Sequence, residues 1–295
     1  ISLKPDYAEF NYNLGSAFKD QGNLEEAIKA YKKAISLKPD YAEFNYNLGT
    51  AFKDQGKLEE ATKTYKKALT IKPNYAEAKY LLSALSGKKT KSAPKEYIEK
   101  LFDKYAVSFE DSLVEKLEYF VPKILTNIVL NLQTNGSLGS LLDLGCGTGL
   151  VGVEIRNFCD KLEGIDLSAP MLEQARLKNI YDNLIQTDIV EYLSNAELDY
   201  DCFISSDVFI YVGYLTDIFQ LIKSRNKRTG KLIFSTEHSE KDGYHLEKTG
   251  RYSHSKSYIT SLCKEFGYTI SHFSITNLRK ERGKFLTGGL YVLNF

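Results

Sequence analysis

A cluster of glycines follows a short apolar stretch near the middle of the chain. The segment reads Ser140-Leu-Leu-Asp143-Leu-Gly145-Cys-Gly147-Thr-Gly149, and the apolar spacing of a helix comes directly after it. Glycine lets the backbone turn sharply and lets a ligand approach without interference from a side chain. The segment therefore predicts a strand, a ligand-binding loop and a helix, in that order.

Two acidic residues follow this loop, each after a further apolar stretch. Asp166 comes 21 residues after Gly145, and Asp188 closes the segment 183–188. A carboxylate in the place of Asp166 can accept hydrogen bonds from both hydroxyls of a ribose, which serves more than one adenosine cofactor. Residues 147–152 also fit the dinucleotide spacing G-x-G-x-x-G, so the glycines alone leave the cofactor open. Both acids could instead act as helix N-caps.

A long polar stretch after residue 237 holds three of the four histidines, His238, His245 and His254. Histidine titrates near neutral pH, which suits a general base. Arg251 lies in the same stretch and could hold a carboxylate or phosphate with two hydrogen bonds, or could brace the loop. The fourth histidine, His272, falls within a predicted strand, where a structural role is expected.

Apolar stretches of strand length alternate with helical patterns from residue 140 to the end of the chain. This order predicts an α/β fold, a doubly wound and mostly parallel seven-stranded sheet that binds its ligands at the carboxyl ends of the strands. The expected strands are 140–143, 161–166, 183–187, 201–207, 231–236, 268–275 and 289–295.

The N-terminal part of the chain is a repeat of 34 residues. Residues 1–34 and 35–68 align without gaps and differ at four positions only. Each copy holds two apolar stripes of helical spacing, separated at Gly22-Asn23 in the first copy and ended by Lys38-Pro39. The repeats predict an all-α stack of paired helices, closed by a last helix at 75–85.

The repeats resemble the tetratricopeptide repeat. The matching positions of the first copy are Leu14, Gly15, Phe18, Ala27, Tyr31, Ala34 and Pro39. The resemblance implies a solenoid that binds a protein or peptide partner on its concave face. Asn13 and Asn47 match the asparagine ladder of protein O-GlcNAc transferases and are candidate peptide-binding residues, although both could be ordinary solvated residues. Because Ile1–Pro5 repeats residues 35–39, we expect the chain to be the end of a longer array.

The glycine segment resembles the first motif of class I S-adenosylmethionine (SAM)-dependent methyltransferases, D/E-x-G-x-G-x-G. In that family the loop holds the methionine and ribose parts of SAM, and S-adenosylhomocysteine (SAH) is the product. Asp188 would face the exocyclic amine of adenine, and Ile189 its ring. The cofactor residues that the resemblance implies are Asp143, Gly145, Cys146, Gly147, Gly149, Asp166, Leu167, Met171, Asp188, Ile189 and Asp207.

Residues 97–111 resemble an aromatic lid of methyltransferases of the ubiquinone/menaquinone-biosynthesis type, F-D-x-Y-A-x-x-F-D. The resemblance implies that Tyr97, Phe102 and Tyr105 cover the cofactor and that Phe109 contacts the substrate. An ordinary amphipathic helix that packs on the core would show the same spacing.

The segment 97–295 also resembles bacterial methyltransferases that carry tetratricopeptide repeats, including the stretch G-R-Y-S-H-S-x-x-Y. This resemblance implies that Arg251 and Tyr258 contact the substrate and that His254, or else His238, is the general base. Tyr211 would face the transferred methyl group. Each histidine could instead have a surface or capping role.

Composition limits the class of protein. The net charge is +1, and the excess of basic residues in 1–94 (16 basic, 11 acidic) forms no continuous stripe, which disfavours nucleic acid as a partner. No apolar run approaches the roughly 20 residues of a membrane-spanning helix. The four cysteines are widely spaced and suggest no metal site, so we expect free thiols and a cytoplasmic location.

These patterns predict repeats at 1–86, a linker at 87–95 and a methyltransferase domain at 96–295. The leading hypothesis is methyl transfer to a small-molecule or carrier-bound acceptor, with the repeats recruiting a protein partner. A second hypothesis is a protein methyltransferase whose repeats present the target peptide. The motif N-P-P-Y of amide and amine methyltransferases does not follow the fourth strand, where Ser206-Asp207-Val-Phe stands. A third is a scaffold that binds the cofactor without turnover.

Overall fold

The computed structural model describes residues 7–110, 117–132, 136–281 and 283–295. The chain divides into two compact units. The first contains Ile1–Thr90 together with Glu247–Gly250, and the second contains Lys91–Leu246 and Arg251–Phe295. The division after Thr90 falls inside the expected linker. None of the helices within the described ranges is long and apolar enough to cross a membrane.

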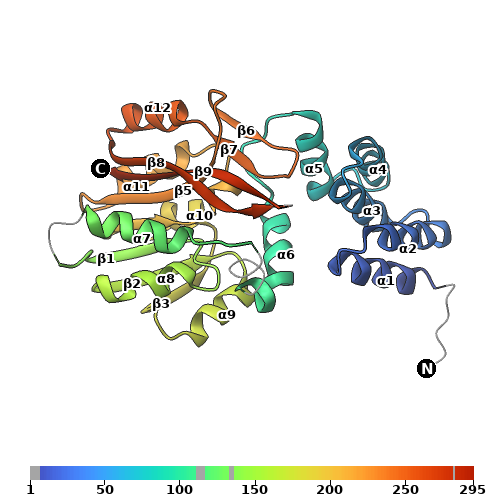
Figure 1. The fold of residues 1–295 in the computed structure, drawn as a ribbon, viewed down its shortest axis with the longest axis horizontal. Helices are drawn as coiled ribbons and strands as arrows, with labels where there is room; N and C mark the ends of the chain where they lie inside the picture. The colour runs from blue at the N-terminus through green and yellow to red at the C-terminus, as the bar shows by residue number, and fades with distance from the viewer. Residues whose placement is uncertain (1–6, 111–116, 133–135, 282) are drawn as a thin grey trace. The chain divides into compact units, whose positions relative to one another are not determined.

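The first unit is a row of helices in which each helix packs against the next (Figure 1, blue to teal). Small residues allow this close packing. A Cβ atom added to Gly15 would lie 2.8 Å from the ring of Tyr31, and one added to Gly49 would lie 2.7 Å from the ring of Tyr65. Both glycines are therefore required by the packing within a repeat. The helices are α1 (Ala8–Asp20), α2 (Leu24–Leu37), α3 (Ala42–Asp54), α4 (Leu58–Ile71) and α5 (Ala76–Ser86).

The second unit is built on one sheet with its parallel strands in the order β3-β2-β1-β4-β5. β9 runs antiparallel to β5 and pairs with β8, which adds the terminal strand pair that the sequence predicts. The strands are β1 (Ser140–Leu144), β2 (Lys161–Asp166), β3 (Asn183–Gln186), β4 (Cys202–Ser205), β5 (Lys231–His238), β8 (Thr269–Glu281) and β9 (Lys284–Asn294).

Helices cover both faces of this sheet, because neighbouring side chains of each strand point to opposite faces. Leu141 packs in the cluster that contains α7 (Val121–Asn131) and α8 (Leu150–Ile155). Leu142 packs in the cluster that contains α10 (Ile189–Asn195), α11 (Thr216–Arg225) and α12 (Lys256–Phe266). The predicted doubly wound α/β fold is confirmed.

The sheet has nine strands rather than the seven expected. The polar stretch after β5, expected to be a loop, contains the hairpin β6 (Tyr244–Leu246) and β7 (Tyr252–His254), and β7 pairs with the end of β5. Tyr252 and His254 are fully buried in this hairpin. The expectation failed because polar and aromatic side chains form this small core, which a search for apolar alternation overlooks.

Candidate active site

The glycine loop lies at the carboxyl ends of β1 and β2. The amides of Gly145 and Cys146 both donate to the carbonyl of Ile165, at 2.8 and 2.9 Å, and the amide of Gly147 donates to Asp166 Oδ2 at 2.9 Å. Gly147 adopts φ +54°, and a Cβ atom added there would meet nothing within 4 Å. The loop is therefore fixed to β2 and leaves open space above Gly147, as a bound ligand requires.

Asp166 accepts hydrogen bonds from the glycine loop and from the start of the next helix. Its Oδ2 accepts from Gly147, and its Oδ1 accepts from the amide of Ser168 at 2.9 Å, at the start of α9 (Ala169–Leu177). Burial raises the pKa of Asp166, while these amides favour the ionised form. A carboxylate can accept about four hydrogen bonds, so Asp166 keeps the capacity to bind a hydroxyl pair.

Asp143 lies beneath the loop and is 1% exposed. Tyr181, which sequence reasoning missed, donates to Asp143 Oδ2 at 2.7 Å. Asp143 Oδ1 is buried and has no hydrogen-bond partner in the part of the chain that the structure describes. Burial raises the pKa of Asp143 to about 7, against the effect of the Tyr181 hydrogen bond.

Asp188 caps the helix after β3. Its Oδ1 accepts from the amide of Glu191 at 3.1 Å and lies 3.3 Å from Lys95 Nζ. Lys95 begins α6 (Lys95–Tyr105), and Ile189 beside Asp188 is half-buried. Asp188, predicted to bind adenine, is therefore the N-cap of α10 and also pairs with Lys95 of the predicted lid helix.

α6 contacts the segments that follow β2 and β4. Ser168 Oγ donates to Asp103 of α6 at 2.6 Å. The ring of Phe102 meets the ring of Tyr211 edge-on, at 5.5 Å between centroids, whereas Tyr105 is 39% exposed. The remaining predicted lid and loop residues are half-buried or buried: Tyr97, Phe109, Cys146, Leu167 and Met171.

The acceptor side begins directly after β4. Asp207 adopts φ +62°, and its amide donates to Ser235 Oγ at 2.8 Å. Tyr211 follows, with its carbonyl accepting from the amide of Ala93 at 2.9 Å. Burial raises the pKa of Tyr211 to about 12, so its hydroxyl can donate a hydrogen bond at neutral pH. The structure thus brings Asp207, Tyr211 and Phe102 together.

A network of buried charges lies beside Asp207. Glu237, at the end of β5, accepts from both Arg251 and Arg279, and Arg251 also pairs with Glu281. Arg279 in turn pairs with Asp207. The predicted substrate residue Arg251 is thus bound to carboxylates of the chain itself. Sequence reasoning missed Arg279, for which the only signal was an arginine in the extended terminal strands.

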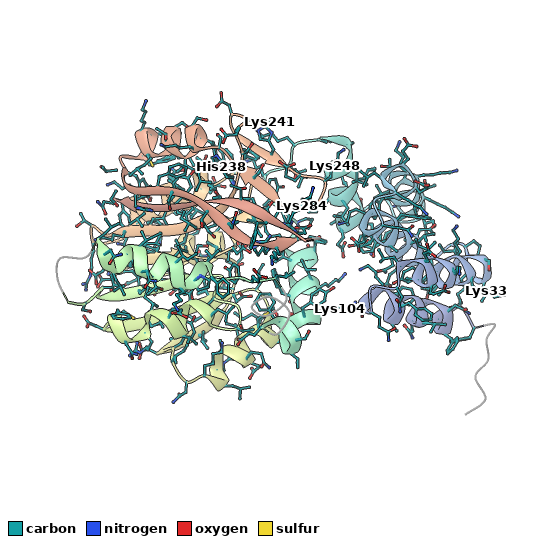
Figure 2. The ribbon with its side chains drawn as sticks, in the orientation of Figure 1. Lys33, Lys104, His238, Lys241, Lys248 and Lys284 are labelled. Atoms are coloured by element: carbon teal, nitrogen blue, oxygen red, sulfur yellow. The ribbon has the colours of Figure 1, made fainter. Side chains whose placement is uncertain are left out.

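His238 does not join this network. His238, labelled in Figure 2, lies next to Glu237 in β5, and neighbouring residues of a strand point to opposite faces of the sheet. His238 Nε2 lies 3.2 Å from Glu240 Oε1, and its buried Nδ1 has no partner among the described residues.

His254 is fully buried in the hairpin core. Its Nε2 lies 3.0 Å from the carbonyl of Val212 and 3.2 Å from that of Gly213, and its ring stacks on Tyr258 at 5.9 Å. The hydroxyl of Tyr258 accepts from the amide of Leu215 at 2.9 Å. These contacts favour a structural role for both residues, and their catalytic and substrate-binding roles stay predictions.

We expect His254 to make stability depend on pH. Burial lowers its pKa from 6.5 to about 4. The unfolded chain then binds the proton more tightly, so the stability is complete above pH 6.5 and is lost as the pH falls toward 4. We expect wild-type protein to lose about 2 kcal/mol more than His254→Gln between pH 7.5 and pH 5, measured by urea unfolding. His245→Gln is the control. Equal losses in wild type and His254→Gln would contradict the expectation.

The two predicted peptide-binding residues lie on neighbouring helices of the first unit. Asn13 of α1 is exposed. Asn47 of α3 donates to the hydroxyl of Tyr12 at 3.2 Å and to the carbonyl of Glu43 at 3.1 Å. The hydroxyl of Tyr12 donates to Glu43 Oε1 at 2.9 Å. Asn47 is thus held by internal hydrogen bonds, and its peptide-binding role stays a prediction.

Comparison with known proteins identifies both units. Residues 15–56 and 49–85 match the model of the TPR (tetratricopeptide) repeat, and residues 113–280, more than half of the chain, match the model of a methyltransferase domain. An uncharacterized methyltransferase of Schizosaccharomyces pombe is 42% identical over 57 residues, which are 19% of this chain and 22% of the relative. The chain therefore aligns with about a fifth of that relative's length.

Solved structures share the fold. Magnesium protoporphyrin IX methyltransferase of Synechocystis PCC 6803 with bound SAH has a TM-score of 0.54 at 17% identity, over 68% of this chain and 99% of that one. A SAM-dependent methyltransferase of Leishmania major has a TM-score of 0.53 at 14% identity, over 68% of this chain and 83% of that one. At these identities the likeness concerns the fold alone.

Proposed function

Because the chain belongs to the methyltransferase-domain family, we propose that it binds SAM and transfers its methyl group to a small-molecule or carrier-bound acceptor. The observation that carries the proposal is the open space above Gly147, bordered by a glycine loop that Asp166 holds in place. Neighbours of the same fold were crystallised with SAM or SAH, which supports this choice of cofactor.

The described residues fit this cofactor. The Asp166 carboxylate retains acceptor capacity for ribose hydroxyls, and we propose that Asp188, at the start of α10, accepts from the adenine amine. Two buried carboxylate oxygens, Asp143 Oδ1 and Asp207 Oδ1, have no partner within the described ranges, and each could accept from the cationic methionine end. Gly149 ends the glycine loop and is the N-cap of α8.

SAM supplies a methyl group on a sulfonium that is already activated for displacement. The chain must then hold the acceptor atom in line with the sulfur–methyl bond that breaks, and it must exclude water. We propose that Phe102 of α6 and Tyr211 form the wall that excludes water, since their rings are in contact. We propose that the Tyr211 hydroxyl, which stays protonated at neutral pH, donates a hydrogen bond to the acceptor. The histidines are secondary candidates for a base, because His254 is enclosed and His238 faces away from Glu237.

We propose that the TPR repeats recruit a protein partner, with Asn13 and Asn47 on the binding face. Three of the four cysteines are buried, and all four are free thiols, which supports a reducing compartment such as the cytoplasm.

The proposal is tested with methyl-deuterated SAM. Purified protein is incubated with extract of its source organism, and small molecules and proteins are searched separately by mass spectrometry. We expect the label in a metabolite or carrier-bound compound, and no label with Asp166→Ala. Label in a peptide would favour the alternative in which the repeats present the target. No label in either fraction, with SAM still bound, would favour an inactive scaffold.

A further inference from the structure

Arg279 bridges the ends of two central strands. It is 6% exposed, its Nη2 donates to Glu237 Oε1 at 2.9 Å, and its Nη1 donates to Asp207 Oδ2. Glu237 is the second-last residue of β5, and Asp207 follows β4 by two residues. A buried guanidinium that binds two carboxylates fixes both in place, because its donors form a rigid planar fork.

An irregularity of the β8–β9 pair accounts for the direction of Arg279. The register shifts between Asn277 and Arg279, so Leu278 is the extra residue of a β-bulge. Leu278 is buried over Gly288, where an added Cβ atom would lie 2.2 Å from the leucine side chain. Bulges change the direction of neighbouring side chains, and this one lets Leu278 enter the core while Arg279 reaches Asp207.

The bulge and Arg279 together hold Asp207 in position. Its left-handed backbone conformation is costly for a residue other than glycine, and such strain persists only where the surroundings hold it. Asp207 Oδ1 is buried and has no hydrogen-bond partner in the described residues. Val208, next in the chain, lies 2.6 Å from where a Cβ atom of Gly145 would be, so this segment touches the glycine loop. The segment that carries Asp207 therefore lies beside the proposed cofactor site.

The charges of the network favour a cationic ligand. Two guanidinium groups, Arg251 and Arg279, pair with three carboxylates, Asp207, Glu237 and Glu281. The network has an excess of one negative charge, with the partly exposed Glu281 at its edge and Asp207 and Glu237 inside it. A ligand with a net positive charge would restore the balance.

We propose that Arg279 is a positioning residue for the cofactor: it holds the Asp207 carboxylate so that Oδ1 accepts a hydrogen bond from the cationic methionine end of SAM. The inference rests on the proposed function, because it takes SAM as the ligand. Arg279 itself touches neither cofactor nor acceptor and acts through Asp207.

The test is a double-mutant cycle on SAM binding, which needs no acceptor. Dissociation constants are measured by calorimetry for wild type, Arg279→Met, Asp207→Asn and the double variant. We expect each single substitution to weaken SAM binding about tenfold, and the double variant to bind no more weakly than either single one. Arg228→Met is the control, because Arg228 also pairs with two aspartates, Asp199 and Asp201, near the opposite ends of the strands.

Each outcome decides the proposal. An unchanged dissociation constant for Arg279→Met overturns it, and so does a loss of equal size in the wild-type and Asp207→Asn backgrounds, which would indicate a general structural role. If Arg279→Met fails to fold, Arg279→Lys carries the test, because one ammonium cannot bridge both carboxylates and about threefold weaker binding is expected. Wild-type protein that binds neither SAM nor SAH would overturn the proposed function itself.

Discussion

Replacing Asp166 with asparagine is expected to abolish measurable binding of SAM and SAH. Asp166 accepts hydrogen bonds from the amides of Gly147 and Ser168, one on each oxygen. An asparagine must present its NH2 group to one of these amides, so one buried donor loses its acceptor, while the bonds from Gly145 and Cys146 to the Ile165 carbonyl remain. Hydrogen bonds to charged groups contribute about 1.5–3 kcal/mol each, so losing one to a backbone amide and one to a ribose hydroxyl of the cofactor corresponds to a weakening of about a hundredfold or more.

Calorimetric titration of SAH into the Asp166→Asn variant measures this loss. Ser168→Ala is a suitable control, because it removes the Ser168 side-chain contacts with Asp103 and with the amide of Met171 but keeps the backbone donor to Asp166. We expect a loss of about threefold for the control. Binding by Asp166→Asn within threefold of wild type would show that the loop holds its shape without the carboxylate.

The parts of the fold that the sequence predicts well are those whose cause is local. The repeats are nearly identical copies, and the packing of Gly15 on Tyr31 recurs as Gly49 on Tyr65. The glycine loop follows from its own spacing, because the turn requires a conformation that only glycine adopts readily. These features need no knowledge of the rest of the chain.

The parts that sequence reasoning missed depend on contacts between distant segments. Arg279 reaches Asp207 only because Leu278 forms a bulge over Gly288. His254 resembled a general base by its residue type, but burial in a hairpin made of polar and aromatic residues is a property of the tertiary structure. Residue type indicates possible chemistry, while burial decides which protonation state is stable.

Asp143 shows most strongly that burial decides the protonation state. We expect Asp143→Asn to raise the stability of the fold at high pH and to weaken cofactor binding. The folded chain raises the pKa of Asp143 to about 7. A carboxyl group whose pKa is raised by folding binds its proton more tightly in the folded state. Its contribution to stability is therefore complete below about pH 4 and is lost as the pH rises to about 7. Asp143→Asn removes this loss, because the amide is neutral at every pH and can still accept from Tyr181.

The Asp143→Asn variant should accordingly be more stable than wild type at pH 8, by about 3 kcal/mol, and no more stable at pH 4.5, as measured by urea unfolding. If the ammonium of SAM pairs with the ionised carboxylate, wild-type affinity for SAM should rise up to about tenfold per pH unit between pH 5.5 and 7. The variant should bind SAM more weakly and with no pH dependence in that range. Calorimetry in two buffers of different ionisation enthalpy would detect the proton that wild type releases on binding at pH 6.5. Absence of that proton release, with SAM bound, would mean that Asp143 stays protonated and that another group neutralises the methionine end.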